Sequence, residues 1–89
     1  MLNEKNRADF QISFGKQIEK LRTLQKLSLR QLAQRCDLDH SDIAKYEKGE
    51  VNIKLTTIYE LIKGLQLTPK DVFDFDFQFT EENKTTSKL

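Results

Sequence analysis

Two helix-start signals follow each other closely in the middle of the chain. Ser28 and Gln31 stand three residues apart, as in a capping box, where the serine hydroxyl accepts a backbone N–H and the glutamine side chain returns to the serine N–H. Asp39 and Asp42 repeat this spacing, and Gly49 is suited to end the helix that follows. Two starts this close are incompatible with one continuous helix. Residues 28–49 are therefore predicted to form two short helices joined by a tight turn.

The predicted turn and the first of these helices carry their own packing signals. Leu32, Ala33 and Cys36 recur at helical spacing and form the expected buried stripe. Asp37 is one of the few non-glycine types that tolerate a left-handed backbone, so we expect it to make the turn. Leu38 is the apolar residue available to fill the angle between the helices.

The second short helix separates into two faces. Ile43, Tyr46 and Glu47 share the side that is expected to turn inward. Five short or polar residues make the outward side: His40, Ser41, Ala44, Lys45 and Lys48. A solvated surface is the ordinary interpretation of such a face. A helix that follows a tight turn after another capped helix is, however, typical of helix-turn-helix motifs, whose second helix enters the DNA major groove, so we favour DNA readout.

The region from Phe14 to Phe73 resembles the helix-turn-helix domain of lambda-type repressors and of the xenobiotic-response-element family of bacterial regulators. The similarity rests on the order and spacing of short segments, namely Leu27-Ser28, Gln31-Leu32-Ala33, the Ile43 to Glu47 spacing followed by Gly49, and Pro69-Lys70-Asp71-Val72-Phe73. The resemblance implies an all-α, compact domain of five helices. It also implies a transcriptional regulator that binds double-stranded DNA.

The same resemblance suggests roles for individual residues. In that family an arginine of the first helix pairs with a glutamate late in the recognition helix, and the matching positions are Arg22 and Glu47. The family loop after the recognition helix contacts phosphate, so Asn52 and Lys54 inherit that role, with ordinary loop residues as the alternative. Leu29 departs from the pattern, because the family commonly has a glutamine there that contacts phosphate or a neighbouring readout residue.

The predicted DNA contacts fall into two sets. Base-edge contacts are assigned to His40, Ser41, Ala44 and Lys45, and phosphate contacts to Ser28, Arg30, Lys48, Asn52 and Lys54. Lysine suits guanine, which presents two acceptors in the major groove. The recognition helix is predicted over about 40–48, and the operator is expected to be an inverted repeat bound by a homodimer.

The charge distribution supports local rather than general attraction to DNA. The net charge is only +1, but residues 1–66 hold 12 Lys or Arg against 9 Asp or Glu, whereas residues 67–89 hold 3 against 5. A non-specific nucleic-acid binder is usually far more basic. Affinity is therefore expected to depend on a local patch and on dimerisation.

The composition argues against several other classes. Eighty-nine residues make one small domain. The chain has one histidine, one cysteine and no glycine-rich phosphate loop, so we expect neither an enzyme nor a bound cofactor. A metal at His40 with Asp39 and Asp42 is not expected, because a helix cap uses those carboxylates and no second histidine or cysteine completes the site. No leader or long apolar run is present, which predicts a cytoplasmic protein without membrane contact, associated with the nucleoid when bound.

Three more helices complete the predicted domain at residues 13–74. Ser13 is expected to cap a first helix with inward Phe14, Ile18, Leu21 and Leu24, preceded by a flexible arm at residues 1–12, either frayed or touching the DNA backbone. A helix from Leu55 to Leu65 lacks a good cap and is expected to turn Leu55, Ile58, Leu61, Ile62 and Leu65 to the core. Thr68, Pro69 and Asp71 form the start signal of a short last helix.

The C-terminal tail, residues 75–89, changes pattern. Alternating phenylalanines precede and enter it, namely Phe73, Phe75, Phe77 and Phe79, with polar residues between them. This period of two suits a strand. Two interpretations stay open: the phenylalanines fold back onto the helices, or they meet the same segment of a second chain as dimer contacts. Residues 81–89 are expected to be disordered.

Two alternative functions remain at this stage. The chain is similar to single-domain controllers of restriction-modification operons, which share the Asn-Ile-x-Leu segment seen at Asn52 to Leu55, and it could equally be a toxin-neutralising antitoxin. A different class is a protein-interaction module that binds a protein partner and little DNA. Leu29 and the two recognition-helix aspartates, Asp39 and Asp42, are compatible with that class.

Overall fold

The computed structural model describes residues 4–80, and in this range the chain is all-α, with five helices and no strand. The helices are α1 (Glu4–Leu24), α2 (Leu29–Ala33), α3 (His40–Lys48), α4 (Leu55–Leu65) and α5 (Pro69–Val72). The predicted five-helix fold class is confirmed. None of the described helices is both long enough and apolar enough to cross a membrane.

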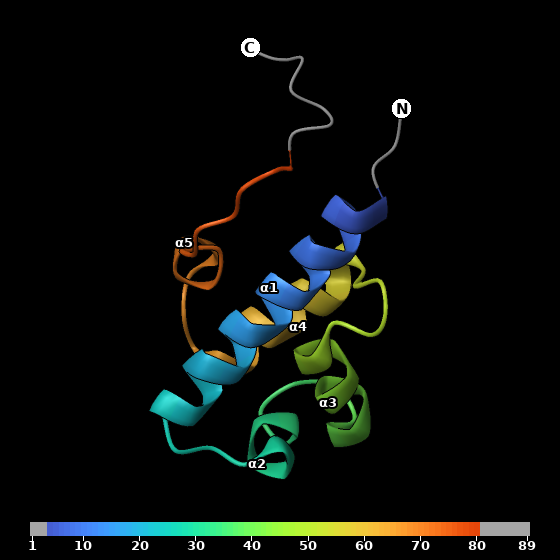
Figure 1. Ribbon diagram of the computed structural model, residues 1–89. Helices are drawn as coiled ribbons and strands as arrows, with labels where there is room; N and C mark the ends of the chain where they lie inside the picture. The colour runs from blue at the N-terminus through green and yellow to red at the C-terminus, as the bar shows by residue number, and fades with distance from the viewer. Residues whose placement is uncertain (1–3, 81–89) are drawn as a thin grey trace.

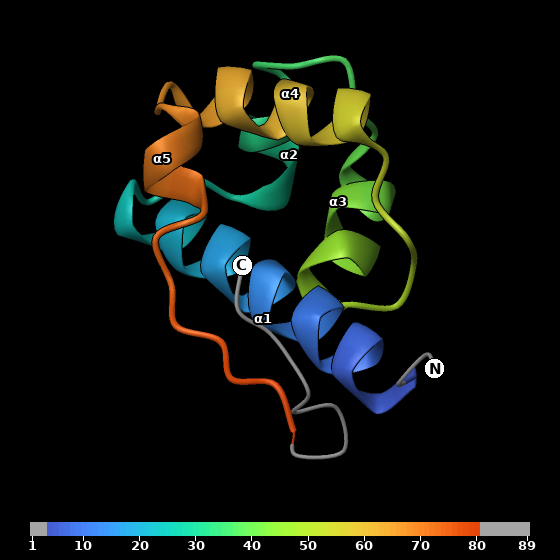
Figure 2. The same cartoon turned by 90° about the horizontal axis from the view of Figure 1, so that it is seen from above.

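The helices surround one core, with the long α1 running diagonally across the molecule in front of α4 (Figure 1). Seven apolar side chains are buried in it: Phe14, Ile18, Leu32, Ile43, Leu61, Leu65 and Val72. Every helix supplies at least one of them, so no short helix has to be stable alone. Seen from above, α3 and α5 lie on opposite sides of the molecule, and α2 lies behind α4 (Figure 2).

Three predicted helix ends are confirmed by their hydrogen bonds. Ser28 accepts the Gln31 N–H at 3.0 Å while its own N–H donates to the Gln31 side chain at 2.8 Å. Thr68 and Asp71 form the same reciprocal pair at 3.2 and 3.0 Å, with proline at the first helical position. Gly49 ends α3 with φ at 72°, a left-handed conformation that glycine adopts without steric cost.

The predicted start of the first helix at Ser13 is wrong. Helix α1 begins at Glu4, so Ser13 lies inside it and residues 4–12 are helical rather than a flexible arm. Lys5 and Asp9 stabilise this extension through an ion pair of 2.8 Å at i,i+4 spacing. Its apolar residues gain support from the tail, which no local pattern in residues 1–12 could indicate.

The phenylalanine tail folds back along α1, as one of the two interpretations held. Ring centroids of Phe73 and Phe14 lie 5.2 Å apart, and those of Phe77 and Phe10 lie 5.1 Å apart. Phe75 lies 5.9 Å from Phe10. The expected strand does not form within residues 4–80. The predicted disorder at residues 81–89 lies outside the described residues.

Two leucines predicted to face the core are exposed instead. Leu24 is 69% exposed because it ends α1 beyond the core. Leu55 is 80% exposed, since helical spacing rotates it away from the buried pair Leu61 and Leu65. Ile58 and Ile62 pack against the core as partly buried residues.

Candidate nucleic-acid interface

The turn between α2 and α3 is held by a side chain from α4. The backbone N–H of Asp37 donates to Glu60 Oε1 at 2.9 Å, and this hydrogen bond lowers the pKa of the Glu60 carboxyl. The predicted left-handed conformation at Asp37 is wrong, because among the described non-glycine residues only Lys26 and Gln66 have positive φ. Leu38 packs against the core as expected. The sequence did not predict this role of Glu60, because no local pattern near Asp37 indicates a hydrogen-bond partner 23 residues later.

Helix α3 begins with a cap that differs in detail from the predicted one. The Asp39 carboxylate accepts the Ser41 N–H at 3.1 Å, and the Ser41 hydroxyl donates to the same oxygen. These two bonds lower the pKa of Asp39. Asp42 does not complete a capping box, because the bond from Asp39 reaches the second residue of the helix rather than the third. The Ser41 hydroxyl is consequently oriented at the exposed start of α3.

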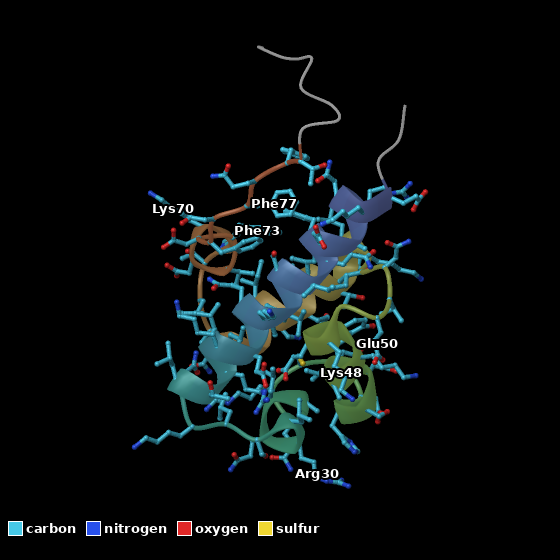
Figure 3. The ribbon with its side chains drawn as sticks, in the orientation of Figure 1. Arg30, Lys48, Glu50, Lys70, Phe73 and Phe77 are labelled. Carbon is cyan, nitrogen blue, oxygen red and sulfur yellow. The ribbon has the colours of Figure 1, made fainter. Side chains whose placement is uncertain are left out.

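The two faces of α3 are separated as the sequence indicated. Ile43 and Glu47 are buried and Tyr46 is partly buried, whereas Ser41, Lys45 and Lys48 are exposed and His40 and Ala44 are partly exposed. Figure 3 shows Lys48 on α3 and Arg30 at the lower edge of the molecule on α2, both far from Phe73 and Phe77. The outward residues therefore form a polar, basic surface that a ligand can reach.

The residues assigned to phosphate on other elements are also accessible. Ser28 and Arg30 are exposed at the start of α2, and a hollow of about 220 Å³ separates Arg30 from Asp39 and His40. Asn52 and Lys54 are exposed in the loop after α3. Lys54 is the N-cap residue of α4 but makes no side-chain cap bond, so its ammonium group is not used to begin that helix.

Helix α3 is fixed to α1 by a buried ion pair. Arg22 and Glu47 meet side by side, with Nε to Oε2 at 2.6 Å and Nη2 to Oε1 at 2.9 Å. Arg22 also donates to the Leu27 carbonyl at 2.8 Å, which joins the loop before α2 to the same group. The hydrogen bonds that the Arg22 guanidinium donates to Glu47 raise the pKa of Arg22. The predicted pair is thus present and links α1, α2 and α3.

Backbone contact between α1 and the end of α3 is close. A Cβ atom at Gly15 would lie 2.4 Å from the Tyr46 carbonyl oxygen and 2.5 Å from that of Glu47. The Gln11 side chain donates to the Gly49 carbonyl at 3.4 Å. The orientation of α3 therefore depends on the middle of α1, at Gln11 and Gly15.

A metal site would need several His, Cys, Asp or Glu side chains, such as Cys36, close together. Within residues 4–80 no three His, Cys, Asp or Glu side chains are grouped as metal ligands would be. Cys36 donates from Sγ to the Leu32 carbonyl at 3.4 Å, and burial raises the pKa of its thiol. It behaves as a small packed side chain.

Comparison with known proteins identifies the family. A family model described as helix-turn-helix matches residues 18–72. The control protein C.BamHI of Bacillus amyloliquefaciens is 32% identical over 68 residues, which cover 75% of this chain and 84% of that protein. The chain belongs to this helix-turn-helix family.

Solved structures agree with this assignment. The restriction-modification controller protein C.AhdI from Aeromonas hydrophila is 32% identical, with a TM-score of 0.70, and the match covers 73% of this chain and 98% of that one. The controller protein C.Esp1396I, solved as a tetramer in complex with its natural 35 base-pair operator, is 22% identical, with a TM-score of 0.67, covering 70% and 82%. At that identity the second likeness concerns the fold alone.

The helix-turn-helix match leaves out both ends of the described chain. Residues 4–17 and 73–80 lie outside the range 18–72. These two segments pack against each other through the phenylalanine contacts, and Thr80 N–H donates to the Asn6 side chain at 3.0 Å. Residues 4–17 and 73–80 therefore pack against each other outside the range that the family model matches.

Proposed function

We propose that this chain is a sequence-specific DNA-binding transcriptional regulator that controls a restriction-modification operon. Its α3 would lie in the major groove, and two copies would bind an inverted repeat. The observation that carries the proposal is the capped, exposed α3, held at a fixed angle by Arg22–Glu47 and Glu60–Asp37. The chain is 32% identical to the control protein C.BamHI and to the restriction-modification controller protein C.AhdI. A regulator of this kind would act in the bacterial cytoplasm, on the nucleoid while bound.

The outward side chains of α3 suit the reading of bases. His40, Ser41, Ala44 and Lys45 occupy successive turns of one exposed face, and the lysine ammonium group is a donor for the guanine acceptors. Ser28, Arg30, Lys48, Asn52 and Lys54 would contact phosphate around that face. Asp39 does not oppose this arrangement strongly, because its carboxylate is bonded to Ser41 at the N-terminus of α3.

Selection of binding sites from a random duplex pool at moderate salt tests the proposal. Recovery of an inverted repeat with half-sites about one helical turn apart is the expected result. The observed affinity for the selected site should also fall steeply as salt rises, because phosphate contacts release counterions. If the folded protein enriches no sequence and its weak binding ignores salt, the DNA-binding proposal fails and a protein-interaction module takes its place.

A further inference from the structure

The Asp42 carboxylate is exposed near the start of α3, but its side chain does not cap that helix. The Asp39 side chain forms the cap by accepting the Ser41 N–H at 3.1 Å, and the Asp42 backbone N–H donates to the Asp39 carbonyl at 3.1 Å. Among residues 4–80, no hydrogen bond or ion pair reaches the Asp42 carboxylate itself. This acceptor therefore stays available to a ligand of α3.

Asp42 shares the outward half of α3 with Lys45. At 3.6 residues per turn it stands about 100° around the helix from the buried Ile43 and about 140° from the buried Glu47, but only about 60° from Lys45. Residues three apart on a helix are neighbours, with Cβ atoms about 5–6 Å apart. Within the described residues no ion pair joins these two opposite charges. An acceptor and a donor therefore lie side by side on the accessible face of α3.

The ordinary role of an acidic residue in the first turn of a helix is electrostatic. Its negative charge stabilises the helix through the dipole of the aligned peptide groups, and Asp42 occupies such a position. This role concerns the stability of α3 alone. It predicts no change in the DNA sequence that the protein prefers when the carboxylate is removed, so binding measurements distinguish it from a role in DNA recognition.

A carboxylate on the DNA-binding face is unfavourable unless it finds a hydrogen-bond donor there. The DNA duplex carries one negative charge for about every 1.7 Å of its axis, and the net charge of the chain is only +1. A charged group that loses its water without gaining a new partner also lowers affinity. Phosphates offer no donor, whereas the amino groups of bases in the major groove do. The exposed Asp42 carboxylate therefore favours those DNA sequences that place an amino group against it.

We propose that Asp42 determines sequence specificity by accepting a hydrogen bond from the N4 amino group of a cytosine. The inference rests on the proposed function, in which α3 lies in the major groove. There cytosine presents an amino donor, whereas guanine presents two acceptors and thymine presents an acceptor and a methyl group. Adenine presents an acceptor beside its amino group, and this acceptor repels the second carboxylate oxygen. Asp42 therefore selects cytosine among the four bases.

Asp42 and Lys45 together predict part of the operator half-site. Base pairs follow each other at about 3.4 Å along the DNA axis, so two side chains one turn apart on α3 reach neighbouring base pairs. The ammonium group of Lys45 suits the two acceptors of guanine, and the Asp42 carboxylate suits the amino group of cytosine. Each half-site should therefore contain two neighbouring G·C pairs, one read at its guanine and the other at its cytosine.

Selection from a random duplex pool at one fixed salt concentration, with wild type, Asp42→Ala and Asp42→Asn, tests the inference. Wild type should recover a cytosine at one position of each half-site. Asp42→Ala should lose that preference, with discrimination between cytosine and the other bases reduced by about tenfold. Asp42→Asn should change the preferred base at the same position from cytosine to adenine, because an amide can accept from the adenine amino group and donate to N7.

Glu50→Gln is the matched control, because it removes the same charge from an exposed residue just beyond the C-terminal end of α3. This variant should keep the base preferences of wild type at every position. Asp42→Asn should in addition bind unrelated duplexes severalfold more tightly than wild type, because it brings one negative charge fewer to the phosphates. Circular dichroism of Asp42→Ala and Asp42→Asn should match wild type, since the Asp42 side chain makes no contact that holds the fold.

Two results would overturn the role of Asp42 and leave the proposed function standing, since in both the wild type still selects an operator. The first is recovery of the wild-type site, unchanged at every position, by Asp42→Ala and Asp42→Asn. The second is a change at the same base position in Glu50→Gln, which would assign the preference to net charge. A folded wild type that enriches no sequence would overturn the proposed function, and the role of Asp42 with it.

Discussion

Arg22 and Glu47 face each other with two parallel hydrogen bonds of 2.6 and 2.9 Å, and so join the end of α1 to the end of α3. Both side chains are nearly buried, with exposures of 12% and 7%. A buried ion pair is a weak source of net stability while both partners are present, but the loss of one partner leaves an uncompensated charge in the interior.

Arg22→Ala should therefore lower the free energy of unfolding by about 3 kcal/mol or more. Urea denaturation followed by circular dichroism measures this change. The double variant Arg22→Met with Glu47→Met is the control, and it should be clearly more stable than Arg22→Ala because it buries no lone charge. Equal stability of Arg22→Ala and wild type would contradict the role assigned to the pair.

Gly15→Ala should destabilise the chain, because the new methyl group would meet two backbone oxygens of α3 within 2.5 Å. Backbone atoms cannot rotate aside as a side chain can, so α1 and α3 would have to separate at a cost of about 1–3 kcal/mol. Gly64→Ala is a matched control, since its nearest neighbour at 2.9 Å is the movable end of the Leu32 side chain. Thermal unfolding of both variants should show the larger loss for Gly15→Ala. Equal losses would show that the close approach is not limiting.

Hydrogen-bond pairs between residues close in the chain could be predicted from the sequence, whereas pairs between distant residues could not. The pairs Ser28 with Gln31 and Thr68 with Asp71 are three residues apart, so a local pattern specifies both ends of each bond. The bond from Asp37 to Glu60 spans 23 residues, and no local pattern joins them. The Arg22–Glu47 pair spans 25 residues and was found only through the family resemblance.

The misjudged N-terminal arm has the same physical cause. Residues 4–12 are polar and, viewed alone, would not hold a helix in water. Their stabilising contacts come from Phe75 and Phe77, more than sixty residues later. The alternation of phenylalanines in the tail was visible in the sequence. A period of two, however, is the same for a β-strand and for an extended segment that packs on a helix.

The tail should stabilise α1 through its aromatic contacts. Phe10→Ala and Phe77→Ala should each lower stability, and the double variant should lose less than the sum, with a coupling of about 0.5–1.5 kcal/mol. Phe10→Ala with Phe79→Ala is the comparison, because Phe79 contacts Phe77 rather than Phe10 among the described ring pairs. Urea unfolding of the full set gives both couplings. A zero coupling between Phe10 and Phe77 would mean that the tail does not hold α1 in solution.

Stability should fall in acid through three carboxylates that accept hydrogen bonds. The pKa values of Asp39, Glu60 and Asp71 are lowered, chiefly by bonds from Ser41, the Asp37 N–H and the Thr68 N–H respectively. A group whose folded pKa is depressed stabilises the fold fully above its unfolded pKa, about 4, and loses this as pH falls through the folded value. Unfolding free energies should therefore drop below about pH 4. Asp71→Asn should make that drop shallower, and a triple replacement of these carboxylates by amides that left the slope unchanged would refute this origin.

Lys45→Ala tests whether α3 reads bases. Lys45 is exposed on the outward face of α3, where its ammonium group is free to donate to a guanine. The substitution should weaken binding to the selected operator by about 1–3 kcal/mol and relax preference at a single base position. Binding titrations against the operator and its single-base variants, at fixed salt, measure both effects. Lys16→Ala removes the same charge from the exposed side of α1 and should leave the base preferences intact. If Lys45→Ala instead lowers affinity equally for every sequence and reduces the salt slope by about one, Lys45 contacts phosphate and another residue of α3 reads the base.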